Sequence, residues 1–456
     1  MSTKNKSSYI PSFQKILSMP SLLKSVRSQF DKIIEPKTKV KSPVISFSDV
    51  LMSGLAIFSL KYPSLLQFDR NKNKSKIKSN LSSLFGIKRS PCDTQMRKRL
   101  DELTLLELRP SFADLHGKLI STNALKDYHY LNGQLLFSVD GTDYFRSTKV
   151  SCSCCNVKNK KNGEIEYSHQ ALACSIVHPD RHQVFPLFHE DINKKKGETK
   201  NDSEQKAAKR LLPEIRKVYK SQKITILEDS LFATAPHLKM LKINNFNYII
   251  AAKPGDHRFL FDIYEKNFRE GKTTEFEITT HDGTLLGYRF INNLPLNASN
   301  KDIHVNFIEH WEIAGKGRYK GIEKIFTYIT DHKLTKSTAA DIAKGGRTRS
   351  KIENETFNTL KNQDYHFEHN YGHGKKHLAS VFVSLMFLMF LIDQIQEASC
   401  DVFKLAHRAS GSRIALWEQM RGLFLEFYII KWEDIYFSIA YGNRSGILKP
   451  NFINTS

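Results

Sequence analysis

The sequence has few cysteines, relatively few acidic residues and no long apolar run, and each shortage excludes a class of protein. Six cysteines in 456 residues are too few for a disulfide-stapled scaffold, and three of them lie together at Cys152, Cys154 and Cys155, which suits a reducing compartment. The strongest apolar run, 381–392, is shorter than the roughly 20 residues of a membrane span, so we predict a buried core helix. The polar, lysine-rich start lacks the apolar segment of a signal peptide. These features predict a soluble, intracellular protein without a membrane partner.

The charge balance is strongly basic. Lysine and arginine number 69 against 47 acidic residues, which gives a formal net charge of +22. Such an excess favours a polyanionic partner, because lysine and arginine neutralise phosphates and release their counterions. Charge alone leaves open the alternative of a merely basic soluble protein.

Composition and periodicity divide the chain into four parts. We predict a basic, flexible arm over 1–45, a helical DNA-binding domain over 46–129, a catalytic core over 130–400 and a C-terminal helical region over 401–456. The alternative for the second part is a helical subdomain that packs on the core.

Within this second part, a helix is expected to start near residue 93. Its basic residues Arg97, Lys98 and Arg99 are then expected to point to solvent. A compact basic helical domain of this kind fits DNA binding.

The core alternates apolar, β-branched runs with amphipathic stretches. The expected strands are 135–139, 170–177, 183–187, 224–227 and 247–252, and the expected helices are 202–219 and 235–241. The order β-β-β-α-β-α-β is that of a ribonuclease-H-like core, so the predicted fold class is α/β with a mixed sheet. Strand-like runs over about 273–330, with a hairpin at Asp282-Gly283, predict an all-β insertion.

Acidic residues follow two of these runs, and a third lies in a later helix. Asp140 and Asp229 come after buried strands, where ligand chemistry collects in open α/β sheets. A regular helix over 349–361 places Glu353 inside an apolar arc, where an acid needs a partner or a metal, and places Glu355 on the far side. The alternative for Glu353 is an ordinary ion pair with Arg349, four residues earlier.

Three converging carboxylates suit divalent cations. Such ions take oxygen ligands and leave positions open for phosphate oxygens. Two of them activate an attacking oxygen and stabilise the leaving oxygen of an in-line displacement. The acids and the basic surplus together indicate metal-dependent phosphoryl transfer on a nucleic acid.

Four stretches carry a resemblance to a known family. They are V-D-G-T-D-Y-F at 139–145, L-E-D-S-L-F-A at 227–233, Y-I-I-A-A-K-P-G-D-H at 248–257 and R-T-R-S-K-I-E-N-E-T-F-N-T-L-K at 347–361 together with E-H-N-Y-G-H-G at 368–374. The chain resembles the DDE-class insertion-sequence transposases with a β-strand insertion before the catalytic Glu, over about 46–395. The resemblance implies Asp140, Asp229 and Glu353 as catalytic ligands of Mg²⁺, with Mn²⁺ able to substitute.

The resemblance also implies contacts to the transposon-end DNA. It points to Arg349 and Lys361, although the related signature has Tyr where this chain has Gly346 and Lys where it has Leu360. We group three further basic residues of these stretches with the DNA contacts: Arg347, Lys253 and His257.

The function that follows is a DNA transposase that cleaves and joins strands at inverted-repeat ends. Its expected partners are the transposon ends, the target DNA and a second copy in a homodimeric synaptic complex, in a bacterial-type cytoplasm at the nucleoid. Two alternatives remain: a ribonuclease-H-like nuclease without strand transfer, and a catalytically silent DNA-binding protein.

A second metal site is suggested by the cysteine cluster. Cys152, Cys154 and Cys155 with His169 have the ligand types of a structural Zn²⁺ site, and the alternative is simply reduced cysteines. Three histidines after the Glu353 helix bind a metal or phosphate, or have a hydrogen-bonded structural role: His366, His369 and His373.

Overall fold

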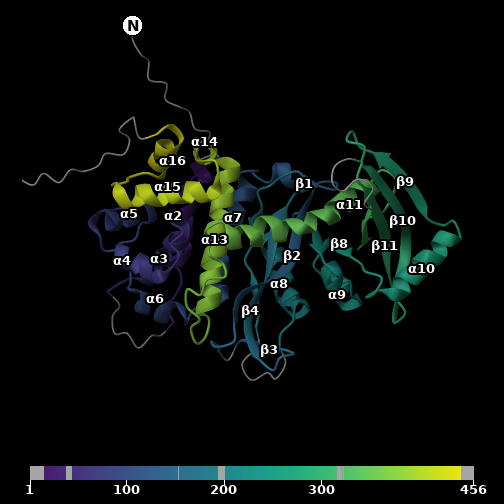
Figure 1. Ribbon diagram of the computed structural model, residues 1–456, viewed down its shortest axis with the longest axis horizontal. Coiled ribbons are helices and arrows are strands. Elements are labelled where there is room, and N and C mark those ends of the chain that lie inside the picture. Colours follow the sequence, from purple (N-terminus) through teal and green to yellow (C-terminus); the bar gives the residue numbers. More distant parts are fainter. Residues whose placement is uncertain are drawn as a thin grey trace, which may run out of the picture.

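The computed structural model describes residues 15–36, 44–152, 154–193, 201–315, 321 and 323–442. The molecule is elongated, with helices at one end, a sheet in the middle and the β insertion at the other end (Figure 1). Parts of the expected arm (1–14 and 37–43) and the end of the chain (443–456) lie outside the described residues.

The described residues before the sheet are helical. They form α2 (Met19–Phe30), α3 (Phe47–Ser59), α4 (Leu65–Asn71), α5 (Ser75–Phe85), α6 (Asp93–Leu100), α7 (Leu105–Ser121) and the short η1 (Lys126–Tyr128). All thirteen residues of α3 are buried, which makes it the centre of this end of the molecule. Its start is capped by Ser46, whose side chain accepts a hydrogen bond from the Asp49 N–H.

The expectation of a flexible arm is wrong for Met19–Phe30. This segment is helix α2, and it packs on α3 and α7 through Leu22, Leu23, Val26 and Phe30. These residues recur at helical spacing and bury an apolar face. The surrounding lysines and serines hide that pattern when the segment is judged by composition.

The expectation for α6 is also wrong in one residue. Arg99 is buried, and its guanidinium binds Glu35 through two hydrogen bonds of 2.5 and 2.6 Å. A planar fork of this kind matches a carboxylate and compensates the burial of both charges. Lys98 is exposed and Arg97 partly exposed, so they alone of the three face solvent.

Twelve strands in the described part of the chain form one mixed sheet. They are β1 (His129–Tyr130), β2 (Gln134–Ser147), β3 (Asn156–Asn159), β4 (Ile165–Val177), β5 (Phe185–Pro186), β6 (Glu190–Ile192), β7 (Ile224–Glu228), β8 (Asn247–Ala251), β9 (Thr274–Thr279), β10 (Leu285–Asn297), β11 (Asn300–Ile313) and β12 (Glu323–Thr330). The main order is β3-β4-β2-β7-β8-β12-β11-β10-β9. β2 is antiparallel to β4 and parallel to β7, and β7 is parallel to β8. The predicted ribonuclease-H-like mixed sheet is thus confirmed.

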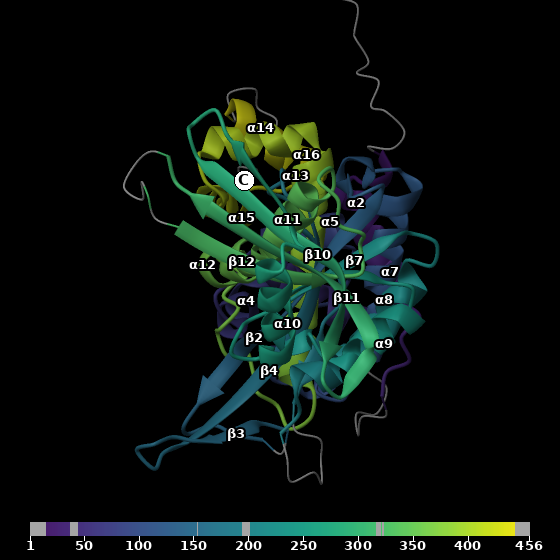
Figure 2. The ribbon, with the colours of Figure 1, turned by 90° about the vertical axis from the view of Figure 1, so that its right-hand side faces the viewer.

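The strands of the β insertion continue this sheet. β12 pairs antiparallel with β8, and β11, β10 and β9 follow as an antiparallel meander, which faces the viewer in Figure 2. A Cβ at Gly287 would lie 1.8 Å from Trp311 Cε2 on the paired strand. Only glycine therefore leaves room for the indole ring at this position. Helix α10 (Arg258–Arg269), which the sequence analysis did not anticipate, buries Leu260, Phe261 and Tyr264 against the insertion.

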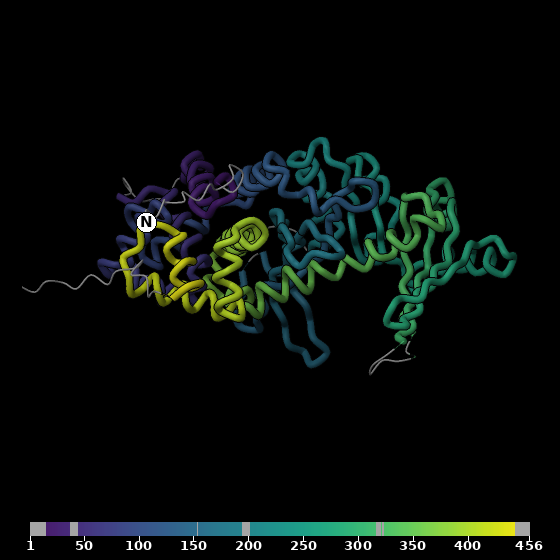
Figure 3. Tube along the Cα trace, turned by 90° about the horizontal axis from the view of Figure 1, so that it is seen from above, coloured from purple at the N-terminus to yellow at the C-terminus, as the bar shows by residue number. Residues whose placement is uncertain are grey.

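Helices cover both faces of the central strands. α8 (Glu204–Val218), η2 (Ser230–Phe232) and α9 (Ala235–Ile243) connect the parallel strands, whereas α11 (Ala339–Arg347), η3 (Thr348–Ser350), η4 (Ile352–Phe357) and α12 (Asn358–Asn362) form one continuous stretch. Phe137 of β2 contacts the Tyr219 ring after α8, while its neighbour Ser138 contacts η3, so the two groups lie on opposite faces. Figure 3 shows the α11–α12 stretch running from the insertion towards the helical end.

Helix α13 (Leu378–Ser399) lies between the helical end and the sheet (Figure 1). It has the length and apolarity of a membrane span, but 94% of its most apolar 18-residue window is buried inside the protein. The predicted core helix is thereby confirmed, and it is longer than the apolar run that suggested it. Three helices follow and pack on one another: α14 (Asp401–Ser410), α15 (Arg413–Glu426) and α16 (Trp432–Tyr441).

Candidate active site

Asp140 and Asp229 lie on neighbouring parallel strands. β2 and β7 are paired in register as far as Ser138 and Leu227, and Asp229 keeps an extended backbone. Continuing that register by two residues sets Asp140 beside Asp229, on the side that Ser138 faces. Ser138 Oγ donates to the Arg349 carbonyl at 2.9 Å, so this side is the one covered by η3.

Strand β2 does not end at Asp140. It continues to Ser147 as a partner of β4, whereas β7 ends at Glu228. Asp140 therefore lies where β2 loses its parallel neighbour.

Arg349 joins Asp140 to Glu353. Its Nη1 lies 2.9 Å from Asp140 Oδ2, although the two residues are 209 positions apart. Glu353 Oε1 lies 3.5 Å from Nη1 and 3.4 Å from Nη2 of the same guanidinium. The predicted i,i+4 pair therefore exists, and Asp140 shares it.

The surroundings of the Asp140 carboxyl disfavour its ionised form. The pKa of Asp140 is raised to about 7: burial is the largest cause, the neighbouring Glu353 carboxylate acts in the same direction, and Arg349 opposes both effects. A carboxyl in these surroundings is kept ionised by added positive charge. Together, the two acids offer oxygen ligands of the kind that hard divalent cations take.

The helix that carries Glu353 is not a regular α-helix. Residues Ile352–Phe357 form a π-helix, η4, so the 100° spacing assumed from the sequence does not apply. The expectation that Glu353 is the more buried acid is wrong: 51% of its side chain is exposed, against 25% for Glu355.

The three predicted carboxylates are not equally close to one another. Asp140 and Glu353 meet at Arg349, whereas Asp229 accepts a hydrogen bond from the Leu231 N–H at 2.9 Å. Within the described ranges, these three acids are not among the groups whose ligand atoms converge closely enough to hold one metal ion. The structure thus brings two of the three into contact and sets the third on the adjacent strand.

Glu204, the first residue of α8, is a further acid beside these strands that the sequence analysis missed. A Cβ at Gly141 would lie 2.4 Å from Glu204 Oε1, so glycine lets this carboxylate approach β2. Burial raises the pKa of Glu204, and the charges of Asp229 and Asp143 add to the shift. In sequence, a glutamate at a helix start is ordinary, because acids are favoured there.

Two predicted DNA contacts besides Arg349 are also held in ion pairs. Arg347 Nη1 lies 2.6 Å from Glu312 Oε1, and its guanidinium carbon lies 3.9 Å from the Phe326 ring centroid. Lys361 Nζ lies 2.9 Å from Glu368 Oε1. Both side chains keep part of their surface exposed.

Lys253 and His257 lie in the loop after β8. Lys253 is exposed, and its backbone N–H donates to His257 Nδ1 at 3.3 Å. Lys253 also lines a cavity of about 780 Å³ between α10 and the insertion strands. Asp256 in the same loop accepts a hydrogen bond from Ser230, which places the loop next to Asp229.

Tyr328 of β12 occupies the space beside Gly346. A Cβ on Gly346 would lie 2.7 Å from Tyr328 Cε1, so the ring packs directly on the helix backbone. Burial raises the pKa of Tyr328 to about 12, and the nearby Arg347 and Arg349 oppose that shift. An aromatic ring contributed by β12 therefore lies next to the site. The related signature instead has a Tyr at position 346.

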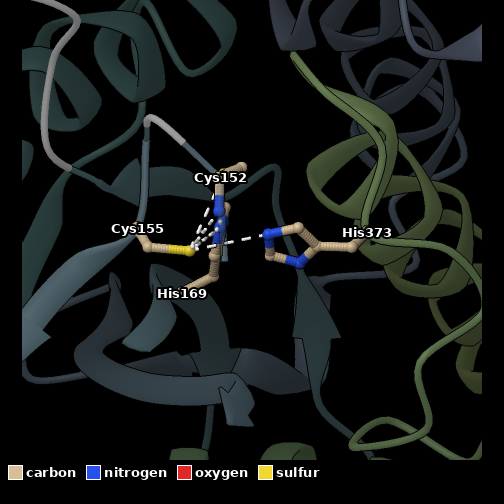
Figure 4. Close-up of side chains that lie close together, drawn as sticks. All are labelled: Cys152, Cys155, His169 and His373. Atoms are coloured by element: carbon tan, nitrogen blue, oxygen red, sulfur yellow. Dashed lines mark hydrogen bonds between the residues drawn. The ribbon is translucent and has the colours of Figure 1, made fainter. Parts of the chain in front are cut away.

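A second cluster lies at the far ends of β2 and β4, shown in Figure 4. Cys152, Cys155, His169 and His373 form a group whose ligand atoms all lie within 4.8 Å of one another. Cys154, which the sequence analysis included, does not belong to this group, and His373 takes its place. A hydrogen bond from Cys152 is the main cause that lowers the pKa of Cys155 to about 7.

Comparison with known proteins identifies the central region of the chain. Residues 160–391, just over half of the chain, match the family described as transposase DDE domain. The matched region begins after Asp140 and includes Asp229 and Glu353. No match was found among curated proteins. On the family match, the chain belongs to the DDE-domain transposases.

Proposed function

We propose that this transposase cleaves and joins DNA at inverted-repeat ends, with Asp140, Asp229 and Glu353 as its catalytic carboxylates. The observation that carries the proposal is the convergence of Asp140 and Glu353 on one guanidinium from distant parts of the chain. Asp229, on the adjacent parallel strand, completes the set.

DDE transposases in general cleave and transfer DNA strands and use divalent metals such as Mg²⁺. The residues present fit such an ion, because their donors are carboxylate oxygens and because an ionised Asp140 needs positive charge beside Glu353. When bound, Mg²⁺ or Mn²⁺ would supply an activated attacking oxygen and would stabilise the leaving oxygen. The three acids of this chain would hold the ions and fix their distance from the scissile phosphate.

Arg349 and the nearby basic side chains suit the DNA backbone. Arg349 lies at the carboxylates and is 25% exposed, so its guanidinium is able to turn from Asp140 to a phosphate. Lys253 and His257 approach from the loop beside Asp229. Arg347 would need to leave Glu312 to reach DNA, which makes it the weakest member of this group.

The π-helix supports Lys361 as a DNA contact. Hydrogen bonds in a π-helix span five residues, so each turn holds about one residue more than an α-helical turn. Lys361 lies eight residues after Glu353, and part of the intervening backbone is the π-helix η4. Lys361 therefore comes near the angular position that the seventh residue after Glu353 would have in a regular α-helix. The one-residue departure from the related signature is then compensated by the backbone.

The remaining parts are proposed to serve assembly. The helical domain over 46–129 would bind the transposon ends, and two copies would hold two ends together in a synaptic complex. The net charge of +22 favours binding to DNA at both stages.

The test is a set of single substitutions assayed on oligonucleotide ends. Asp140→Asn, Asp229→Asn and Glu353→Gln should each abolish Mg²⁺-dependent end cleavage and leave gel-shift binding largely intact. The matched control is Glu355→Gln, two residues from Glu353 in the same π-helix, which should retain cleavage. Retained cleavage in Asp229→Asn would reject the assignment.

The same assay distinguishes the two alternatives. Pre-cut ends that are joined to target DNA exclude a nuclease without strand transfer. A wild-type protein that shifts the ends in a gel but does not cut them with Mg²⁺ or Mn²⁺ is a silent DNA-binding protein.

A further inference from the structure

Four sulfur and nitrogen ligand atoms converge at the ends of β2 and β4. Cys152 Sγ and Cys155 Sγ lie 3.7 Å apart, and His169 Nε2 lies 3.3 and 3.2 Å from them. His373 Nε2, from a segment more than 200 residues away, lies 3.5 Å from Cys155 Sγ. Figure 4 shows the four side chains pointing toward one another.

Four of the six separations between these ligand atoms are close to the edges of a tetrahedral zinc site, and all six are within 4.8 Å. With bonds of about 2.3 Å to sulfur and about 2.05 Å to nitrogen, the expected edges are about 3.8 Å between sulfurs and about 3.6 Å between sulfur and nitrogen. The observed 3.7 Å and 3.2–3.5 Å therefore lie within a few tenths of an ångström of these values.

The surroundings of the donors favour metal ligation. Tyr144 Oη lies 3.4 Å from His169 Nδ1, so a proton on Nδ1 leaves the Nε2 lone pair directed at the cluster. The backbone N–H of Cys152 donates to Cys155 Sγ at 3.3 Å, and that of Cys154 donates to Cys152 Sγ at 3.4 Å. Such N–H donors stabilise negative charge on sulfur.

We propose that Cys152, Cys155, His169 and His373 bind one structural Zn²⁺ ion. Two thiolates and two imidazoles are ligands that zinc prefers, and four protein ligands leave no open position for catalysis. This inference does not rest on the proposed transposase chemistry.

The ion would tie two distant parts of the chain together. Cys152, Cys155 and His169 belong to the β2–β4 side of the core, whereas His373 lies in the segment 363–377 that links the Glu353 helix to α13. Zinc at this point would therefore fix the segment that follows the Glu353 helix.

The same segment is also fixed from the helical end of the molecule. The Asp101 carboxylate accepts backbone hydrogen bonds from Lys375, Lys376, His377 and Leu378, which begin two residues after His373. Gly374 has φ +69°, and a Cβ there would lie 2.3 Å from Asp101 Oδ1, so glycine is required at the turn. The turn presents His373 to the core while α6 and α13 hold its other side.

A disulfide between Cys152 and Cys155 is the main competing interpretation. Its sulfurs would be about 2.05 Å apart, well short of the observed separation. A disulfide would also not explain why His169 and His373 are directed at the two sulfurs.

The experiment uses the full-length chain without a polyhistidine tag, expressed with added zinc and purified under reducing conditions. Elemental analysis should find about one zinc per chain. Cys155→Ser and His373→Ala should each lower retained zinc more than about tenfold, since loss of a direct ligand exceeds the effect of its neighbours. Cys154→Ser is the matched control in the same segment and should retain the ion.

Two further measurements guard against misfolded variants. His373→Cys offers another zinc ligand in the partly exposed loop and should restore the metal. Cobalt substitution of the wild type should give the intense visible absorption of tetrahedral Co²⁺ with thiolate ligands, reduced in His373→Ala. A wild type without zinc, zinc loss in Cys154→Ser equal to that in Cys155→Ser, or a Cys152–Cys155 disulfide in the purified protein would overturn the proposal.

Discussion

The buried ion pair between Lys61 and Asp393 allows a sharp test of how the helical end is attached to α13. Lys61 Nζ lies 2.7 Å from Asp393 Oδ2, and the two side chains are 0% and 4% exposed. Tyr365 donates a 2.6 Å hydrogen bond to the same oxygen, and the ammonium lies 3.8 and 4.3 Å from the ring centroids of Tyr365 and Trp417. The pair therefore joins the end of α3 to α13 and α15.

The direction of the pKa shifts shows what the pair costs. Burial lowers the pKa of Lys61 and raises the pKa of Asp393, in each case against the attraction of the partner. The loss of hydration thus outweighs the mutual attraction. Removing one partner leaves an unpaired buried charge, whereas removing both relieves the loss of hydration.

We expect Lys61→Met to lower the free energy of unfolding of this end by about 3–5 kcal/mol. The double variant Lys61→Met with Asp393→Leu should be more stable than Lys61→Met. A remainder of about 1–3 kcal/mol is expected from the Tyr365 hydroxyl, which loses its acceptor, and Tyr365→Phe should remove it.

Urea unfolding followed by tryptophan fluorescence measures these effects, because Trp417 lies against the ammonium and Trp432 is in the same part of the molecule. Asp31→Asn is the matched control, since Asp31 belongs to an exposed pair with Arg27 worth at most about 1 kcal/mol. A loss below about 1 kcal/mol in Lys61→Met, or a double variant less stable than the single one, would refute the reasoning.

Three further predictions concern other parts of the molecule. His116 is buried between Tyr219 and a backbone carbonyl, and burial lowers its pKa from 6.5 to about 4. The contribution of the neutral imidazole to the free energy of unfolding is therefore full above pH 6.5, and about 2 kcal/mol of it should be lost at pH 5. Urea midpoints at pH 7 and pH 5 should show this loss in the wild type and no such loss in His116→Gln. Gly346→Ala should destabilise by about 1–3 kcal/mol through overlap with the Tyr328 ring, and Tyr328→Leu in the same chain should relieve it; an alanine variant more stable than wild type contradicts the packing. Arg349→Gln should increase the thermal stabilisation by Mg²⁺, because the guanidinium competes for the carboxylates; an unchanged shift in melting temperature argues against a metal at this site.

The central sheet was predictable because its signal is local. The runs before Asp140 and after Lys223 are apolar, β-branched and short, and their order along the chain already matches a mixed sheet. The apolar run 381–392 is equally local and predicted a buried helix because it is short, although α13 as a whole has the length of a membrane span.

The errors have a shared physical cause: each depends on a partner that is distant in the chain or on a small change in backbone hydrogen bonding. Arg99 looks like a solvent-facing residue until Glu35, 64 positions away, is placed beside it. The π-helix shares the apolar content of an α-helix and differs only in hydrogen-bond span, so periodicity gave Glu353 the wrong exposure.

The second cluster shows the same limit in its ligand set. Cys152, Cys155 and His169 lie close enough in the chain to be grouped by eye, but the fourth member, His373, is 218 positions from Cys155. Adjacency in the chain favoured Cys154 instead. Only the pairing of β2 with β4 and the turn held by Asp101 bring His373 to the other three.

These contacts show that the segment after Glu353 connects the carboxylate site to the helical end of the molecule. It begins at the π-helix, whose first acid shares Arg349 with Asp140, and it ends at α13, which is buried between the helical end and the sheet. Between these points the segment is fixed by Asp101 from one side and, on our proposal, by zinc from the other. Asp101 and the proposed zinc therefore both act on the segment that connects α13 to the helix that carries Glu353.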